Sequence, residues 1–295
     1  MSGIYSYSDY VVKPFLATLA LGELLKRSAL RLFLGAGASA GFGLPAWKLL
    51  IARVLGRDGD PSFLAVLDAT SPTDQRRQID PLDDASEAYF LKVHTALYRD
   101  SAADLLTQLQ RSPLLLAVAA MMTGLHRGRI DSVVTYNYDD LLEQYLRMLG
   151  LSVCRRLQPD ALSTRADVEL NYPHGRLPQS WDPIAASQII LSEKSYRARR
   201  AEIDQGWSAY VVQGLYAKIA LFVGMSGDDA SVLDTLKRAQ HRVQRAEDYT
   251  GYWLLTPDAF ERNKSDILDV GMCPVRLEVD EIPKFLFEVC QRAAT

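Results

Sequence analysis

Short apolar runs alternate with longer stretches of helical spacing along this 295-residue chain. The runs end at Gly, Pro, Asp or Asn, which is typical of buried strands. The predicted strands are Arg31–Leu34, Ser132–Thr135, Ile189–Ser192, Ala220–Gly224, Tyr252–Thr256 and Val275–Val279. The predicted helices are Leu44–Leu55, Leu141–Leu149, Val232–Val243 and Ile282–Val289. Strands that alternate with helices predict an α/β fold, in which helices flank a mainly parallel sheet.

Two regions interrupt this alternation. Residues 58–125 are poor in strand signals and rich in turn signals such as Asp60-Pro61 and Ser112-Pro113, so they predict a helical module inserted into the domain. The rest of the domain, approximately residues 28–57 and 126–295, carries the sheet, and residues 1–295 are expected to form one domain. The second interruption, residues 176–208, is polar, and its Tyr196–Arg200 charge run is interpreted as a solvated helix face.

Charge and cysteine content exclude several classes of protein. The chain has 33 Lys and Arg against 36 Asp and Glu, a net charge of −3, so direct nucleic-acid binding is not expected. The three cysteines, too few for a four-cysteine zinc site, suit a reducing cytosol rather than a disulfide framework. The apolar run at residues 15–25 is too short and too interrupted to span a bilayer. We therefore expect a cytoplasmic protein without a membrane partner.

A glycine-rich turn follows the first predicted strand. Residues 35–39 read Gly-Ala-Gly-Ala-Ser, and no Gly-Lys-Ser/Thr follows, so the turn is not a Walker A loop. Glycines let the backbone approach a ligand closely, and free N–H groups at such a turn suit a pyrophosphate. A plain strand-to-helix turn is the alternative. The candidate binding residues are Gly35, Ala36, Gly37, Ala38 and Ser39.

Polar residues follow a second buried strand in the segment Thr135-Tyr-Asn-Tyr-Asp-Asp140. Asn137 and Asp139 lie where this strand opens onto a loop, a place where side chains meet ligands in parallel sheets. Alternatively, Asp139 or Asp140 caps the helix that follows, and Asn137 satisfies the loop backbone.

Two further motifs complete the set. His174 precedes a glycine in Asn171-Tyr-Pro-His-Gly175, and histidine suits proton transfer near neutral pH, although a lone histidine is more often a satisfied structural residue. Gly224 and Ser226 follow another apolar run and can contact a ribose or phosphate, or form a plain turn in which Asp228 or Asp229 caps the next helix. All four motifs are predicted at carboxyl ends of strands, so they are expected to face one crevice.

The order of these motifs is distinctive: Gly-Ala-Gly-x-Ser, Thr-x-Asn-x-Asp, His-Gly and Gly-x-Ser. The chain resembles the sirtuin (SIR2) superfamily, and within it the bacterial SIR2-like NAD-cleaving effectors of antiphage defence. Tyr-Asn-Tyr-Asp and the segment Ile189–Tyr196 are typical of that branch. The resemblance extends roughly from Leu30 to Val279, is weakest in residues 58–125, and implies a Rossmann-like SIR2 fold.

The resemblance also implies roles for the candidate residues. The glycine loop, residues 35–39, would hold the NAD⁺ diphosphate, and Gly224 and Ser226 would lie near the adenosine end. Asn137 would position water and the nicotinamide ribose, Asp139 would lie near the nicotinamide amide, and His174 would act as the base. The implied activity is cleavage of NAD⁺ to nicotinamide and ADP-ribose without a metal. Homo-oligomers are implied as well, and a separate defence partner such as a HerA-like ATPase is a hypothesis for regulation.

Two departures from deacylating sirtuins stand out. Those enzymes usually carry a four-cysteine zinc module, which three cysteines cannot supply, and an Asp-Phe-Arg motif where this chain has Ala46-Trp47-Lys48. We expect no zinc module here, and core packing for Trp47 rather than a place in the nicotinamide pocket. A zinc-free protein deacylase or ADP-ribosyltransferase remains an alternative, as does a non-catalytic module that binds NAD or ADP-ribose.

Overall fold

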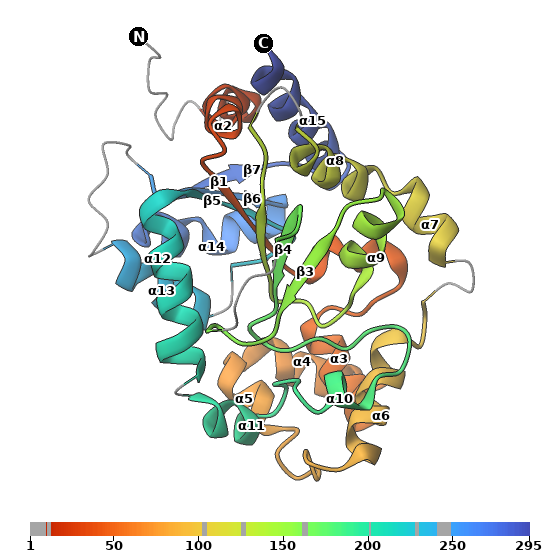
Figure 1. Cartoon of the computed structure of the whole chain (residues 1–295). Coiled ribbons are helices and arrows are strands. Elements are labelled where there is room, and N and C mark those ends of the chain that lie inside the picture. The colour runs from red at the N-terminus through yellow and green to blue at the C-terminus, as the bar shows by residue number, and fades with distance from the viewer. Residues whose placement is uncertain are drawn as a thin grey trace.

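A parallel β-sheet forms the centre of the computed structural model, which describes residues 10, 13–101, 105–124, 128–160, 165–200, 202–227, 230–240 and 249–295 (Figure 1). Seven strands of this part of the chain pair in the order β3-β4-β2-β1-β5-β6-β7, and every neighbouring pair is parallel. The strands are β1 (Leu30–Leu34), β2 (Ser132–Thr135), β3 (Val153–Arg156), β4 (Val168–Asn171), β5 (Ile219–Val223), β6 (Gly251–Leu255) and β7 (Met272–Arg276). The predicted α/β class with a parallel sheet is confirmed.

The central strands are apolar on both faces because helices cover both. Every residue of β1 and β5 is buried. Alternate side chains of β1 enter two separate cores: Leu32 belongs to one, and Phe33 belongs to the other. In the second core, Phe222 stacks between Phe33 and Trp253, at ring-centroid distances of 4.4 and 4.1 Å. Such continuous apolar runs are what a doubly covered parallel sheet requires.

Two layers of helices bury these cores (Figure 1). The first layer contains α2 (Ala17–Lys26), α8 (Pro113–Met122), α9 (Leu141–Met148) and α15 (Glu281–Ala294). Gly22 of α2 allows the close crossing of α2 and α15, since an added Cβ would overlap Arg292. The second layer contains α12 (Ser208–Ala217), α13 (Ala230–Gln240) and α14 (Pro257–Asp269).

The described residues between 58 and 124 form helices joined by turns and short loops, with no strand among them. They form α4 (Pro61–Ala69), α5 (Pro72–Arg77), α6 (Glu87–Tyr98), α7 (Leu105–Arg111) and α8. The Asp-Pro and Ser-Pro turn signals at 60 and 112 are helix N-caps with proline at the first helical position, a placement that proline favours. Helices α4, α5 and α6 lie beyond one end of the sheet (Figure 1). Beside them lie α3 (Trp47–Leu55), α10 (Pro183–Ala186) and α11 (Glu193–Ala198). By contrast, α8 packs beside α15 in the first layer.

One predicted strand is wrong, and two strands were not predicted. Ile189–Ser192 is not a strand: its apolar side chains are buried, but Ile190 donates its N–H to the His174 carbonyl in a loop, and Ser192 caps α11. Strands β3 and β4 escaped prediction because each is four residues long and carries polar side chains such as Arg155 and Glu169.

Some element boundaries also differ from the prediction. Strand β7 begins three residues earlier than predicted, and Pro274 is accommodated because β7 lies at the edge of the sheet. Helix α3 begins at Trp47 rather than Leu44, since two 3₁₀ turns, Ala36–Ala38 and Ala40–Phe42, follow β1. Helix α13 covers the predicted helix Val232–Val243 as far as Gln240, and residues 241–243 of that prediction lie outside the described part of the chain.

The order of the strands places a crevice at the carboxyl end of β1. The chain passes from β1 to β2 on one side and later returns to β5 on the other side of β1. Connections that leave a strand in opposite directions open a gap between the loops, where ligands bind in sheets of this kind. The loops after β1, β2 and β5 carry three of the four motifs, and the loop after β4 carries the fourth.

Candidate active site

The glycine loop after β1 packs directly against the loop after β5. Gly37 donates its N–H to the Gly224 carbonyl at 2.9 Å, and Gly224 has a φ of +73°. A Cβ on Gly35 would lie 2.6 Å from the Gly224 oxygen, and a Cβ on Gly37 would lie 3.0 Å from the Gly224 Cα. All three glycines are therefore required for the two loops to cross, whatever binds there.

Most N–H groups of the glycine loop already have acceptors in this conformation. Backbone carbonyls accept from the N–H groups of Gly35, Gly37, Ala38 and Ser39. The sequence predicted that such N–H groups are free to bind a diphosphate. In the observed geometry, these four N–H groups hold the loop, and Gly35 and Gly37 face the backbone of Gly224.

Asn137 joins this loop to the end of β2. The residue is only 8 % exposed, and its Nδ2 donates to Ser39 Oγ at 3.1 Å. Its backbone N–H donates to Thr135 Oγ1 at 3.2 Å. The Oδ1 atom is buried and accepts no hydrogen bond in the structure. A buried amide oxygen without a donor costs about 1–3 kcal/mol, so Oδ1 is suited to accept from water or a ribose hydroxyl.

Asp139 is buried beside the same pair of residues. Its Oδ1 accepts from the Leu141 N–H at 3.2 Å, so Asp139 provides the helix cap that the sequence offered as an alternative to a ligand role. Burial raises the pKa of Asp139 to about 6, against a smaller lowering by a hydrogen bond with Ser39. Asp139 therefore titrates within the range that proton chemistry uses.

Asp140 has a structural role instead. Its carboxylate pairs with Arg176 at 3.0 Å and accepts from the Gln179 N–H at 3.0 Å, and it makes no side-chain cap to α9. Arg176 also lies 3.1 Å from Glu143. This buried cluster holds the segment that follows His174 against α9, and no local pattern in the sequence predicts it.

His174 follows β4, is half-buried, and lies beside Tyr136. Its ring meets Tyr136 edge-on, with 5.3 Å between ring centroids. A small pocket with a volume of about 20 Å³ adjoins the imidazole. Its lining residues are Tyr136, Pro173, His174, Tyr196, Ile203, Trp207, Ser208, Val211 and Thr235. Such a volume holds a single water molecule.

Gly175 allows the turn that follows His174. Its φ is +84°, and a Cβ would lie 2.8 Å from the Gln188 carbonyl carbon. The glycine is therefore required by the backbone of residues 188–189, which runs past the turn and bonds to the His174 carbonyl through Ile190.

Ser226 lies at the rim of the site. Its side chain is exposed, and its carbonyl, rather than its hydroxyl, accepts from Asn263 Nδ2 at 2.7 Å. The suggested cap residues Asp228 and Asp229 lie outside the described residues.

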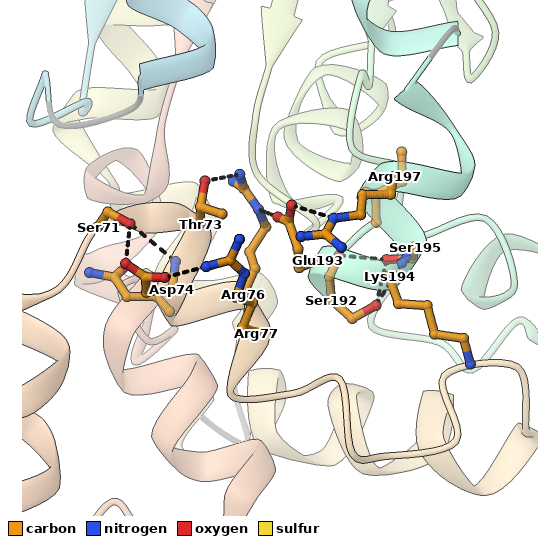
Figure 2. Close-up of polar contacts among 12 residues, drawn as sticks. Ser71, Thr73, Asp74, Arg76, Arg77, Ser192, Glu193, Lys194, Ser195 and Arg197 are labelled. Carbon is orange, nitrogen blue, oxygen red and sulfur yellow. Dashed lines mark hydrogen bonds and ion pairs between the residues drawn. The ribbon is translucent and has the colours of Figure 1, made fainter.

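A polar network ties the helices at residues 58–124 to the pocket wall (Figure 2). Arg76 of α5 pairs with Glu193 of α11 at 3.0 Å, and both side chains are largely buried. The Arg76 guanidinium also lies 4.4 Å from the ring centroid of Tyr196, which lines the pocket at His174. Trp47 belongs to this region too: its Nε1 donates to Gln75 of α5 at 2.9 Å, and its ring packs on the core.

Sequence reasoning missed three aromatic residues of the pocket. Tyr136 lies inside the Tyr-Asn-Tyr-Asp motif, so its position beside Asn137 was a usable signal. Tyr196 is the last residue of Ile189–Tyr196, a segment that supported the family resemblance. Trp207, on the π-helical turn Glu202–Trp207, had no such signal, and its Nε1 is buried without a hydrogen-bond partner.

Among these residues, no group of three or more His, Cys, Asp and Glu is arranged to hold a metal ion. None of the helices in the described ranges has the length and apolar character needed to cross a bilayer.

Comparison with known proteins gives one family match. A search of curated proteins finds no significant relative. The match, to the SIR2-like domain, covers residues 131–270, which run from the start of β2 to the end of α14. This range contains Asn137, Asp139, His174 and the loop after β5, and leaves out the glycine loop. Residues 131–270 are therefore similar to the SIR2-like domain.

Proposed function

We propose that this protein is an NAD⁺ glycohydrolase, which cleaves NAD⁺ with water to nicotinamide and ADP-ribose. The observation that carries the proposal is the buried Asn137, whose Nδ2 is fixed by Ser39 while Oδ1 has no partner. The amide lies at the switch point of a parallel sheet, where ligands of such folds bind. The SIR2-like match over residues 131–270 supports NAD⁺ as the substrate.

Each residue has a part in this hydrolysis. Oδ1 of Asn137 accepts a hydrogen bond from the attacking water or from a ribose hydroxyl and so orients the reacting groups. The water oxygen bonds to C1′ of the ribose as the bond from C1′ to nicotinamide breaks, and nicotinamide leaves as a neutral molecule. His174 takes the proton that the water loses. The loops after β1 and β5, which pack against each other at the switch point, hold the rest of the dinucleotide.

The pocket beside His174 has room for a water molecule, which is the acceptor that hydrolysis needs. Tyr196, Ile203 and Trp207 line this pocket.

We also propose that the activity serves antiphage defence by depleting NAD⁺, as the resemblance implies. An unregulated NAD⁺ hydrolase would be toxic to its own cell, so assembly into homo-oligomers or a partner such as a HerA-like ATPase is expected to control it. Full activity of the isolated chain at low concentration would argue against such control.

The test is release of nicotinamide from NAD⁺ by the purified chain, with no peptide added and over a wide range of protein concentration. Asn137→Ala and His174→Gln are expected to lose at least about 100-fold in kcat/KM. His94→Gln is the matched control, because His94 bonds to the Pro178 and Gln179 carbonyls and does not line the pocket.

Two results would redirect the proposal. Turnover that requires an acylated peptide, or label transferred to protein, would indicate a deacylase or ADP-ribosyltransferase. Tight NAD⁺ binding without turnover, both alone and in cells that express the neighbouring genes, would indicate a binding module.

A further inference from the structure

A second pocket lies at the opposite, amino ends of the strands. It has a volume of about 410 Å³, within the range of small-molecule sites. Strands β1, β2 and β4 and helix α12 form its walls, on the face of the sheet that α12 covers. The residues that carry its chemistry are Arg31, Asp131, Arg156, Glu169, Tyr210 and Lys218. Nothing in the proposed hydrolase reaction uses this pocket.

Arg31 is a cation of this pocket that has hydrogen-bond donors without acceptors. The residue is only 9 % exposed, and its Nη2 donates to Tyr210 Oη at 3.3 Å. Its Nε and Nη1 atoms are buried without an acceptor. Within the described ranges, no carboxylate lies at ion-pair distance from Arg31, although a buried charge normally needs such a partner.

The two carboxylates of the pocket are already engaged. Glu169 pairs with Arg156 at 2.9 Å and accepts from Tyr210 Oη at 2.6 Å. Asp131 pairs with Lys218. The three cations of the pocket therefore outnumber its carboxylates, and the excess positive charge resides on Arg31.

Gly214 of α12 makes room for the Arg31 guanidinium. A Cβ on Gly214 would lie 2.5 Å from Arg31 Cζ and closer still to Nη1. Glycine is, after proline, the least favourable residue in a helix interior, and Gly214 lies inside α12. Glycine therefore lowers the intrinsic stability of α12 at a position where a side chain would displace the guanidinium.

We propose that this pocket binds a small oxyanion through a carboxylate or phosphate group, with Arg31 as its anchor. A guanidinium presents paired N–H groups that match both kinds of oxyanion. Binding would turn the two unfilled donors of Arg31 toward the anion and would supply the negative charge that the pocket lacks. Tyr210 and Arg156 flank the same space.

Thermal unfolding with inorganic phosphate or citrate, each against sodium chloride of equal ionic strength, tests the proposal. At tenfold excess over Kd, a bound anion is expected to raise the Tm by about 3 °C. A response to phosphate alone or to citrate alone identifies the preferred group. The rise is expected to vanish in Arg31→Met and in Gly214→Ala, and to remain in Arg27→Met, which removes an exposed arginine.

Two outcomes would overturn the proposal. One is no rise beyond the chloride control with either anion. The other is a rise that persists in Arg31→Met or Gly214→Ala, because the anion would then bind elsewhere, such as at the glycine loop. If Arg31→Met does not fold, Gly214→Ala decides, since alanine favours the helix and changes only the space beside the guanidinium. Failure of the hydrolase assay would leave these results unaffected.

Discussion

Asn137 Nδ2 donates to Ser39 Oγ at 3.1 Å, although the two residues are 98 positions apart in the chain. The bond joins the loop after β1 to the loop after β2 and leaves Asn137 Oδ1 as the unsatisfied atom. The buried carboxyl of Asp139 lies two residues further along the same loop. The geometry of the candidate site therefore depends on a residue of the glycine motif.

Replacing Ser39 is expected to impair the proposed reaction without removing a reacting group. Ser39→Ala leaves Asn137 without its acceptor, so we expect kcat/KM for nicotinamide release to fall about tenfold and stability to fall by about 1 kcal/mol. Steady-state kinetics and urea unfolding measure the two effects. Ser187→Ala removes an exposed hydroxyl and is the control. Wild-type kinetics in Ser39→Ala would show that this bond does not position the site.

The raised pKa of Asp139 makes stability depend on pH. The pKa is about 6 in the folded chain against 3.8 when exposed, so folding favours the protonated form. The stability gained from this is present below the unfolded pKa and is lost as the pH rises through about 6. Between about pH 4 and pH 7.5, the wild type should lose about 2 kcal/mol relative to Asp139→Asn. Urea unfolding of both proteins over this range measures the difference, and parallel pH curves would contradict it.

The ion pair between Arg76 and Glu193 is expected to stabilise the contact of α5 with α11. Both side chains are largely buried, at 13 and 8 % exposure (Figure 2). Removing Glu193 leaves the Arg76 charge without a carboxylate, whereas removing Arg76 leaves Glu193 paired with Arg197. Glu193→Gln should therefore cost about 3 kcal/mol and Arg76→Leu less, and the double variant should cost clearly less than the sum. The matched cycle on the exposed pair Lys264 and Glu261 should show a coupling below about 1 kcal/mol. Additive effects in the buried pair would refute its role.

Gly175 is expected to tolerate no side chain. Gly175→Ala places a Cβ against the Gln188 backbone at a φ of +84°, so it should cost more than about 2 kcal/mol and displace His174. Gly56→Ala is the control: its φ is +70°, but nothing lies within 4 Å of the added Cβ, so only the backbone cost of about 1 kcal/mol applies. Thermal unfolding and nicotinamide release measure both variants. Equal stability losses would show that the contact with Gln188 is unimportant.

Local patterns in the sequence determined the class of fold and the position of most central strands. The apolar runs at β1, β2, β5 and β6 were predicted because strands buried on both faces need continuous apolar side chains. The Asp-Pro and Ser-Pro signals at 60 and 112 were also readable from the sequence, because an N-cap side chain bonds to backbone N–H groups only two or three residues further along. Motif order also led to the SIR2-like resemblance, which the family match supports over residues 131–270.

Only the tertiary structure decided how the motif residues are used. Ile189–Ser192 has the composition of a strand, but its backbone bonds run to the His174 loop, whereas the polar β4 pairs with β2 and β3. Gly35 and Gly37 face the backbone of Gly224, and Asp139 is buried beside Ser39 while Asp140 pairs with Arg176. Propensity and periodicity report on near neighbours in the chain. Burial, pKa and unfilled hydrogen bonds depend on residues that are distant in sequence, which only the packing of the fold brings together.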